Sequence, residues 1–187
     1  LVFAYDAGST RSYPGTGTTV SNIIDGSTGT LANGVAFNSA NGGFWEFDGT
    51  DDSIIIPNAN SPQFTANQAF TISYMVYLNR VTGIYMAPVM KGSFASSYGH
   101  LIGAANVFLV YTDDDSSPEL YVNNMLDNDV GKWVFITQTY DGSRIYVYRN
   151  GEFFTQSGTG KNFTVNTSDL TLGSMNTGSY FLDGDMA

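Results

Sequence analysis

The stretch 132–153 constrains the fold of this chain more than any other. It contains two runs in which apolar and polar side chains alternate, each followed by a turn sequence: Trp133–Tyr140 with Asp141-Gly142-Ser143, then 144–149 with Asn150-Gly151. Alternation places every second side chain on the same face of a strand. Asp-Gly and Asn-Gly accept the positive φ that tight hairpin turns require. The stretch therefore predicts consecutive antiparallel strands, with a further strand beginning at Glu152.

The composition extends this prediction to the whole chain. Hydrophobic residues make up 42% and aromatic residues 14%, and β-branched and aromatic side chains dominate over Leu and Ala. Such side chains suit the pleated, half-buried surface of a sheet. The 21 glycines supply frequent turns. We predict one all-β domain over 1–187, with about a dozen strands in the two antiparallel sheets of a jelly-roll sandwich.

The strand predictions differ in strength along the chain. The clearest are 44–47, Ser53–Ile56 and Phe70–Leu78, and the weakest is 1–5. Further strands are expected at 84–90, 101–111, 163–165, Leu170–Leu172 and 180–182, and 91–93 is expected to be a connector. No segment has the periodicity of a helix.

Charge and cysteine content exclude several classes of partner and site. The formal net charge is −10, so the chain repels nucleic-acid phosphates and anionic lipids. No apolar run is long enough to span a bilayer, so no membrane insertion is expected. The chain has no cysteine, which rules out disulfides and thiolate zinc sites.

Several segments, taken in order, resemble laminin G-like, or concanavalin A-like, domains. They are FDGTDDSI at 47–54, FTIS at 70–73, the hairpin at 133–151, LTLG at 170–173 and FLDGDMA at 181–187. The resemblance implies the two-sheet jelly roll predicted above. Relatives continue through a further strand after the position of Ala187. We therefore expect the natural polypeptide to continue, or another chain to supply that strand.

The opening sequence, YDAGSTRSYPGTGTT at 5–19, is similar to the start of laminin G-like domains in tailed-phage structural proteins. This resemblance implies a non-enzymatic structural or decoration protein of a virion capsid or tail. Its expected partners are other virion proteins or copies of itself, with adhesion to surface glycans as a further role. The alternative is a secreted or cell-surface carbohydrate-binding module of a bacterium or, less favoured, a glycoside hydrolase of the same fold.

Two groups of aspartates are candidate calcium ligands, because the resembled family often holds one Ca²⁺ and this cation prefers oxygen ligands. The first group is Asp48, Asp51 and Asp52, and the second is Asp183 with Asp185. The alternative is that these aspartates bond the backbone of their own turns. That alternative is favoured more strongly for 113–115, which is expected to be an exposed loop tip.

Tyrosines on the predicted strands are candidates for glycan stacking or for a protein interface. Alternation puts Tyr146 and Tyr148 on one face of their strand. Tyr74 and Tyr77 lie on a different predicted strand, Phe70–Leu78. Trp133 opens its strand and is expected to anchor the core or its rim.

One arrangement resembles a catalytic one. Glu46, Asp48 and Asp51 approximate the Glu-x-Asp-x-x-Glu pattern of some glucanases with this fold, but the third residue follows a turn and is one methylene shorter. His100 is the only histidine, and no nucleophile elbow accompanies it. We predict no catalytic residues and therefore no enzyme.

Overall fold

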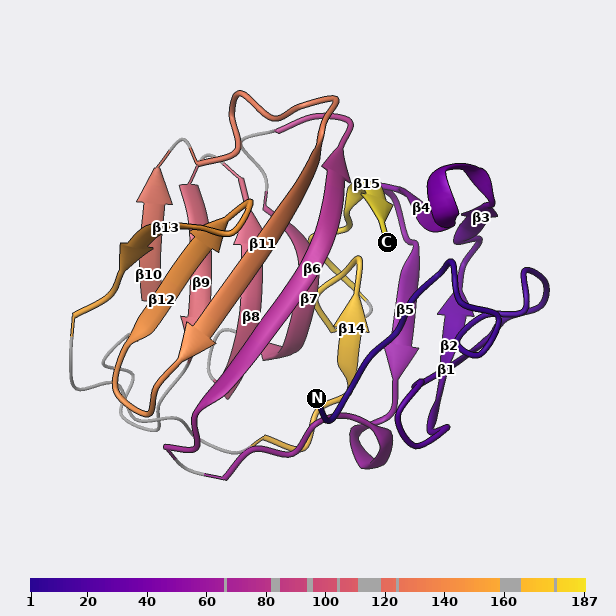
Figure 1. Ribbon diagram of the computed structural model, residues 1–187, viewed down its shortest axis with the longest axis horizontal. Coiled ribbons are helices and arrows are strands. Elements are labelled where there is room, and N and C mark those ends of the chain that lie inside the picture. Colours follow the sequence, from indigo (N-terminus) through magenta and orange to yellow (C-terminus); the bar gives the residue numbers. More distant parts are fainter. Residues whose placement is uncertain are drawn as a thin grey trace.

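The computed structural model describes residues 1–65, 67–81, 85–93, 96–103, 105–110, 119–123, 125–158, 166–176 and 178–187. The chain folds into two antiparallel sheets packed face to face, with β6, β11 and β12 in front of β8, β9 and β10 in Figure 1. Every pairing between named strands is antiparallel. The predicted all-β jelly-roll sandwich is confirmed.

The eight-stranded sheet has the order β1-β2-β5-β14-β7-β8-β9-β10. Its strands are β1 (Thr19–Ser21), β2 (Thr28–Ala32), β5 (Ser53–Ile56), β14 (Leu170–Leu172), β7 (Met86–Ser93), β8 (Ser96–Ile102), β9 (Ala105–Val110) and β10 (Glu119–Asn123).

The seven-stranded sheet has the order β13-β12-β11-β6-β15-β4-β3. Its strands are β13 (Glu152–Gln156), β12 (Ile145–Arg149), β11 (Trp133–Tyr140), β6 (Phe70–Leu78), β15 (Asp183–Met186), β4 (Phe44–Asp48) and β3 (Ala36–Asn38). Helix is limited, in the described ranges, to the 3-10 turns η1 (Ala40–Gly42) and η2 (Asn58–Asn60). None of the described helices has the length and apolarity needed to cross a bilayer.

The core lies between the two sheets and follows the predicted alternation. On β6 and β11, Val76, Leu78, Val134 and Ile136 are buried while their neighbours in sequence are more exposed. Burial of such a side chain contributes roughly 1.5–3 kcal/mol. The strand faces that do not pack into this core therefore form the outer surfaces of the sandwich.

The central hairpin has the predicted antiparallel pairing and turns. β11 pairs with β12, and β12 with β13. Asn150 and Gly151 have φ of 52° and 83°, as the tight turn between β12 and β13 requires. At the preceding turn, Asp141 Oδ1 accepts the backbone N–H groups of Ser143 and Arg144, both at 2.8 Å.

Four local predictions are corrected by the structure. Residues 1–5 form no strand, because Ala4 instead donates to the Asn22 side chain at 3.0 Å. Residues 91–93 continue β7 and pair with β8. The single strand expected at 101–111 is divided between β8 and β9, which form a hairpin. Residues 180–182 are outside the ladders, which resume in β15. The prediction for 163–165 lies outside the described residues.

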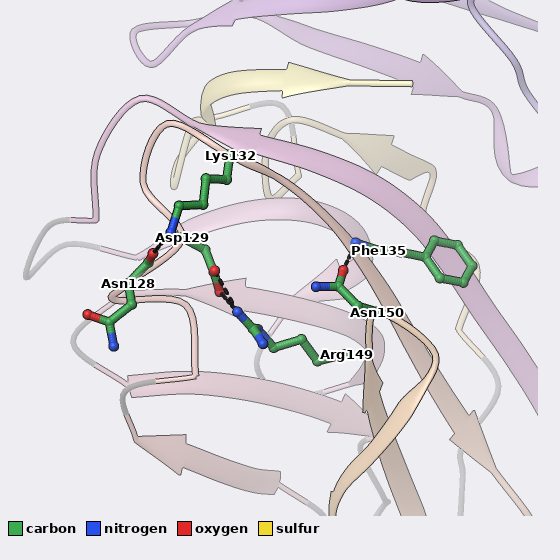
Figure 2. Close-up of polar contacts among 6 residues, drawn as sticks. All are labelled: Asn128, Asp129, Lys132, Phe135, Arg149 and Asn150. Atoms are coloured by element: carbon green, nitrogen blue, oxygen red, sulfur yellow. Dashed lines mark hydrogen bonds and ion pairs between the residues drawn. The ribbon is translucent and has the colours of Figure 1, made fainter.

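The loop before β11 is tied to the end of β12 by an ion pair between the buried Asp129 and the half-buried Arg149. Figure 2 shows Arg149 bonding both carboxylate oxygens of Asp129, at 2.9 Å from Nε and 2.5 Å from Nη2. The side chain of Asn150 accepts the N–H of Phe135 at 3.0 Å. These bonds fix the start of β11, and with it the side chain of Trp133.

Candidate functional site

Five residues form a row across the outer face of the seven-stranded sheet. The register pairs Trp133 with Tyr77, Tyr77 with Asp185, Asp185 with Glu46, and Glu46 with Ala36. Directly paired residues in antiparallel strands share a face. We call these five residues the cross-strand row. It crosses β11, β6, β15, β4 and β3, and its ends are roughly 19 Å apart, given about 4.8 Å between neighbouring strands.

The row faces outward because the adjacent position on each strand is committed to the core. Val134, Val76, Met186 and Trp45 are all buried. Their sequence neighbours in the row are therefore directed to the opposite face, and all five row residues are partly or fully exposed.

The β11 end of the row is aromatic. The rings of Trp133 and Tyr77 lie 5.7 Å apart at an interplanar angle of 57°. Phe44 is buried and packs edge-on against Trp133 at 5.5 Å. This packing holds the indole ring in place while leaving part of it exposed. A partly exposed ring on a rigid strand can stack against the apolar face of a ligand.

The β4 end of the row is a polar hollow of about 510 Å³. Its polar lining consists of the carboxylates of Glu46, Asp48, Asp52 and Asp185 and the side-chain amides of Asn33 and Asn79. Glu46 is oriented by Asn38, whose Nδ2 donates to Glu46 Oε1 at 3.1 Å. Burial raises the pKa of Asp185 to about 6, and the negative charges of Glu46 and Asp183 add to the rise.

The structure brings Asp48, Asp51 and Asp52 together, as their spacing predicts. One carboxylate oxygen from each lies within 4.8 Å of the others. Asp52 is buried and its Oδ2 accepts the N–H of Asp48 at 3.0 Å. Burial raises the pKa of Asp52, and the charges of Asp48 and Asp51 add to the rise. This group could hold a cation, but local turn bonding accounts for part of its geometry, so calcium stays a prediction.

Asp183 and Asp185 lie two positions apart on the same face of β15, so a calcium site at this pair also stays a prediction. Asp183 is opposite Asp48 and forms an ion pair with Arg80 at 2.5 Å, and its Oδ1 accepts the Asn79 amide at 2.9 Å. Asp185 is the member of the pair that belongs to the row. The aspartates at 113–115 lie outside the described residues.

The predicted tyrosines divide between the two faces of the sheet. Tyr146 and Tyr148 share the outer face with Tyr77, although both lie off the row on β12. The prediction that Tyr74 contacts a glycan or a partner protein is wrong. Tyr74 is buried between the sheets, where its hydroxyl bonds Nδ1 of His100. Burial raises the pKa of Tyr74 well above its usual range. Tyr74 therefore cannot contact a ligand on the outer face.

A sequence model described as the concanavalin A-like lectin/glucanases superfamily, of laminin G type, matches residues 48–187. The chain belongs to this superfamily. Among curated proteins, none matches significantly. The match to the superfamily agrees with the resemblance seen in the ordered segments of the sequence.

Several solved structures resemble the chain in fold at low sequence identity. Domain 4 of AbnA, a GH43 extracellular arabinanase from Geobacillus stearothermophilus in complex with arabinotriose, has a TM-score of 0.61 and 16% identity over 89% of this chain and 82% of that one. The receptor-binding domain of botulinum neurotoxin type G has a TM-score of 0.62 and 14% identity, and the match covers 89% of this chain and 44% of that one. Trypanosoma rangeli sialidase in complex with sialic acid has a TM-score of 0.63 and 12% identity, and the match covers 92% of this chain and 28% of that one. These likenesses show the fold.

The glucanase-like residues of this superfamily member do not occupy one strand. Glu46 and Asp48 point to the same face of β4, two positions apart. Asp51 follows the turn at Gly49, whose φ is 75°, and its carbonyl accepts the Asn33 side chain at 2.8 Å. The third carboxylate is therefore carried by the turn and not by β4.

Sequence reasoning considered Glu46 only as a catalytic candidate and Trp133 only as an anchor. The sequence did carry a signal that Trp133 faces outward, because Trp133 lies two positions from Phe135 on β11 and Phe135 is exposed. The pairing of Glu46 with Asp185 joins strands far apart in the chain, and no local pattern fixes such a register.

Proposed function

We propose that this domain is a non-enzymatic carbohydrate-binding module that holds a glycan across the outer face of its seven-stranded sheet. The observation that carries the proposal is the cross-strand row, in which the Trp133–Tyr77 aromatic pair lies next to the Asp185 and Glu46 carboxylates. Binding sites commonly combine an apolar surface with a few fixed polar groups.

The two ends of the row suit the two kinds of surface on a sugar. The C–H face of a pyranose or furanose ring is apolar and stacks on the ring of Trp133 or Tyr77. Sugar hydroxyl groups can donate to the carboxylates of Glu46 and Asp185, and hydrogen bonds to charged acceptors are strong. Both ends are built on paired strands, which lowers the entropy cost of binding.

The comparisons support this proposal at the level of fold. One similar domain is described in complex with arabinotriose and one similar enzyme in complex with sialic acid. The lack of an enzymatic role is part of the proposal. It is supported by the position of Asp51, which the turn carries away from the strand that holds Glu46 and Asp48.

A second candidate function is attachment to a virion as a structural or decoration protein, on an extracellular particle. The opening at 5–19 suggests it, and one surface observation favours it: Phe153 and Phe154 on the edge strand β13 are 58% and 44% exposed. Exposed aromatic residues are enriched at protein interfaces. The glycan-binding module would then act in adhesion; otherwise it would belong to a secreted or cell-surface protein.

A glycan array followed by calorimetry tests the proposal. We expect the wild-type protein to bind at least one glycan class, and Trp133→Ala to weaken that binding at least tenfold, about 1.4 kcal/mol. Phe154→Ala is the matched control, because it removes an exposed aromatic ring away from the row. Thermal unfolding verifies that both variants fold. Absence of glycan binding, or equal binding by Trp133→Ala, would refute the proposal.

A further inference from the structure

The charge around the hollow has a single sign. Its lining includes four carboxylates, those of Glu46, Asp48, Asp52 and Asp185. Among the residues that the structure describes, none of those lining the hollow is Lys, Arg or His. A concave surface lined by one sign of charge concentrates its field and repels ligands of that sign.

Arg80, the cationic side chain next to the hollow, is already paired with an aspartate of the protein. Arg80 Nε lies 2.5 Å from Asp183 Oδ2, and Asn79 donates to the other oxygen of the same carboxylate at 2.9 Å. Asp183 is itself opposite Asp48 in the sheet. Arg80 is therefore committed to an aspartate of the protein, and an anionic ligand would have to displace that carboxylate to use it.

The hollow can nevertheless accept hydrogen bonds from a neutral ligand. Ionised carboxylates act as acceptors only, and each offers two oxygens. Asn38 occupies Oε1 of Glu46, while none of the described residues donates to Oε2, and both Glu46 and Asp185 line the hollow. A pair of sugar hydroxyl groups supplies the donors that these oxygens need. A sugar carboxylate supplies none and adds a negative charge.

We infer that the glycan held by the cross-strand row is a neutral one, bound through its hydroxyl groups by Glu46 and Asp185, and that sialylated and uronic-acid-containing glycans are rejected. This inference rests on the proposed function and specifies its ligand class. The net charge of −10 also repels acidic glycans, but salt screens this repulsion at a distance. The carboxylates of the hollow repel an acidic glycan at the binding site itself.

The test compares neutral sugars with acidic counterparts: one pair differs by an added sialic acid, and the other by a carboxylate in place of the C6 hydroxymethyl group. Binding is measured for lactose and sialyllactose, and for galactose and galacturonic acid oligomers of equal length, at mildly alkaline pH and low ionic strength. We expect each neutral sugar that binds to do so at least about tenfold more tightly than its acidic counterpart, because like-charge contacts are strongly unfavourable.

Two variants separate local selection from net charge. In Glu46→Gln/Asp185→Asn the shape of the hollow is kept and two charges are removed, so the preference should fall to about twofold or less. Asp127→Asn removes an exposed charge away from the hollow and should keep the full preference. Tighter or equal binding of the acidic sugars, with Trp133→Ala still weakening binding at least tenfold, overturns the inference and leaves the proposed function standing. Binding of no sugar overturns both.

Discussion

Asp185 and Glu46 face each other directly on the neighbouring strands β15 and β4, with both side chains on the outer face of the sheet. Like charges in this position destabilise a sheet. Asp185 is also partly buried, and burial is the main reason that its pKa rises to about 6. Residues that destabilise the fold locally, as this pair of like charges does, are concentrated at functional sites. The pair therefore agrees with a surface kept for a ligand.

Asp185→Asn should therefore stabilise the fold. Because the folded-state pKa is raised from 3.8 to about 6, the protonated form favours folding. The associated stability is complete below pH 3.8 and is lost as the pH rises through about 6. Above that range we expect Asp185→Asn to unfold with a free energy about 1 kcal/mol higher than the wild type, after allowance for solvent screening.

Urea titrations across this pH range measure the effect. The gain in Asp185→Asn should shrink as the pH falls and vanish near the lower limit. Asp127→Asn, which removes an exposed carboxylate, should track the wild type throughout. A gain in Asp185→Asn that is the same at every pH would contradict the assignment.

Part of this site could be predicted from the sequence, and part could not. The bounds of β5, β6, β11 and β14 were predicted correctly, because strict alternation or a compact apolar run ended at a turn sequence. The same alternation shows that Tyr74 and Tyr77, three residues apart, must face opposite sides of β6. Only one of the two could therefore contact a ligand on the outer face, and naming both as candidates was an avoidable error.

The row itself could not be predicted in this way. Asp185 is adjacent to Tyr77 and Glu46 only because β15 inserts between β6 and β4. The order of strands in a sheet depends on how the whole chain packs, while alternation along one strand carries information only about its two faces. The grouping of Asp48 with Asp52 was accessible because a single turn contains both.

A buried lysine supports the opposite sheet. Lys91 is 2% exposed, and its ammonium donates to Asn58 Oδ1 and Ser61 Oγ at 2.7 Å and to the carbonyl of Ser168 at 2.6 Å. Lys91→Met should cost about 2–3 kcal/mol of unfolding free energy, because three acceptors lose their donor. Lys132→Met, at an exposed lysine with one backbone bond, should cost less than about 0.5 kcal/mol.

The pH dependence of the Lys91 variant provides an independent check. Burial lowers the pKa of Lys91 to about 8 in the folded protein, despite the opposing charge of Asp169. The unfolded chain therefore binds more protons between pH 8 and 10.5, and the stability of the wild type should gain from this group as the pH rises through that window. Lys91→Met should lack this gain in chemical denaturation. An identical pH profile in both proteins would show that the ammonium is not desolvated.

The calcium prediction can be tested on the Asp48, Asp51 and Asp52 group. If the group holds Ca²⁺, adding the ion at 100 times its dissociation constant should stabilise the wild type by about 2.7 kcal/mol. We expect Asp52→Asn to lose this response, since it removes the buried charge of the three. Asp127→Asn should retain it. A melting temperature of the wild type that is unchanged between excess chelator and excess Ca²⁺ would reject calcium here.

The Asp129–Arg149 ion pair at the start of β11 should affect both stability and binding. The Asp129 side chain is only 6% exposed and accepts three hydrogen bonds from Arg149, whose side chain is half-buried. Asp129→Asn leaves the guanidinium without its counter-ion, which should cost about 2 kcal/mol because solvent screens part of that charge. The matched control is Arg80→Met at the more exposed Arg80–Asp183 pair, where we expect about 1 kcal/mol or less.

The same variant links the loop to the proposed site. The bonds of Asp129 hold the segment that leads directly into Trp133. The N–H of Gly131 donates to the carbonyl of Leu78 at 2.9 Å, next to Tyr77. A looser loop would let the indole sample more orientations. Asp129→Asn should therefore weaken glycan binding severalfold at temperatures where it is still fully folded, mainly through faster dissociation. Unchanged dissociation kinetics in a destabilised Asp129→Asn protein would mean that packing against Phe44 and Tyr77 is enough to position Trp133.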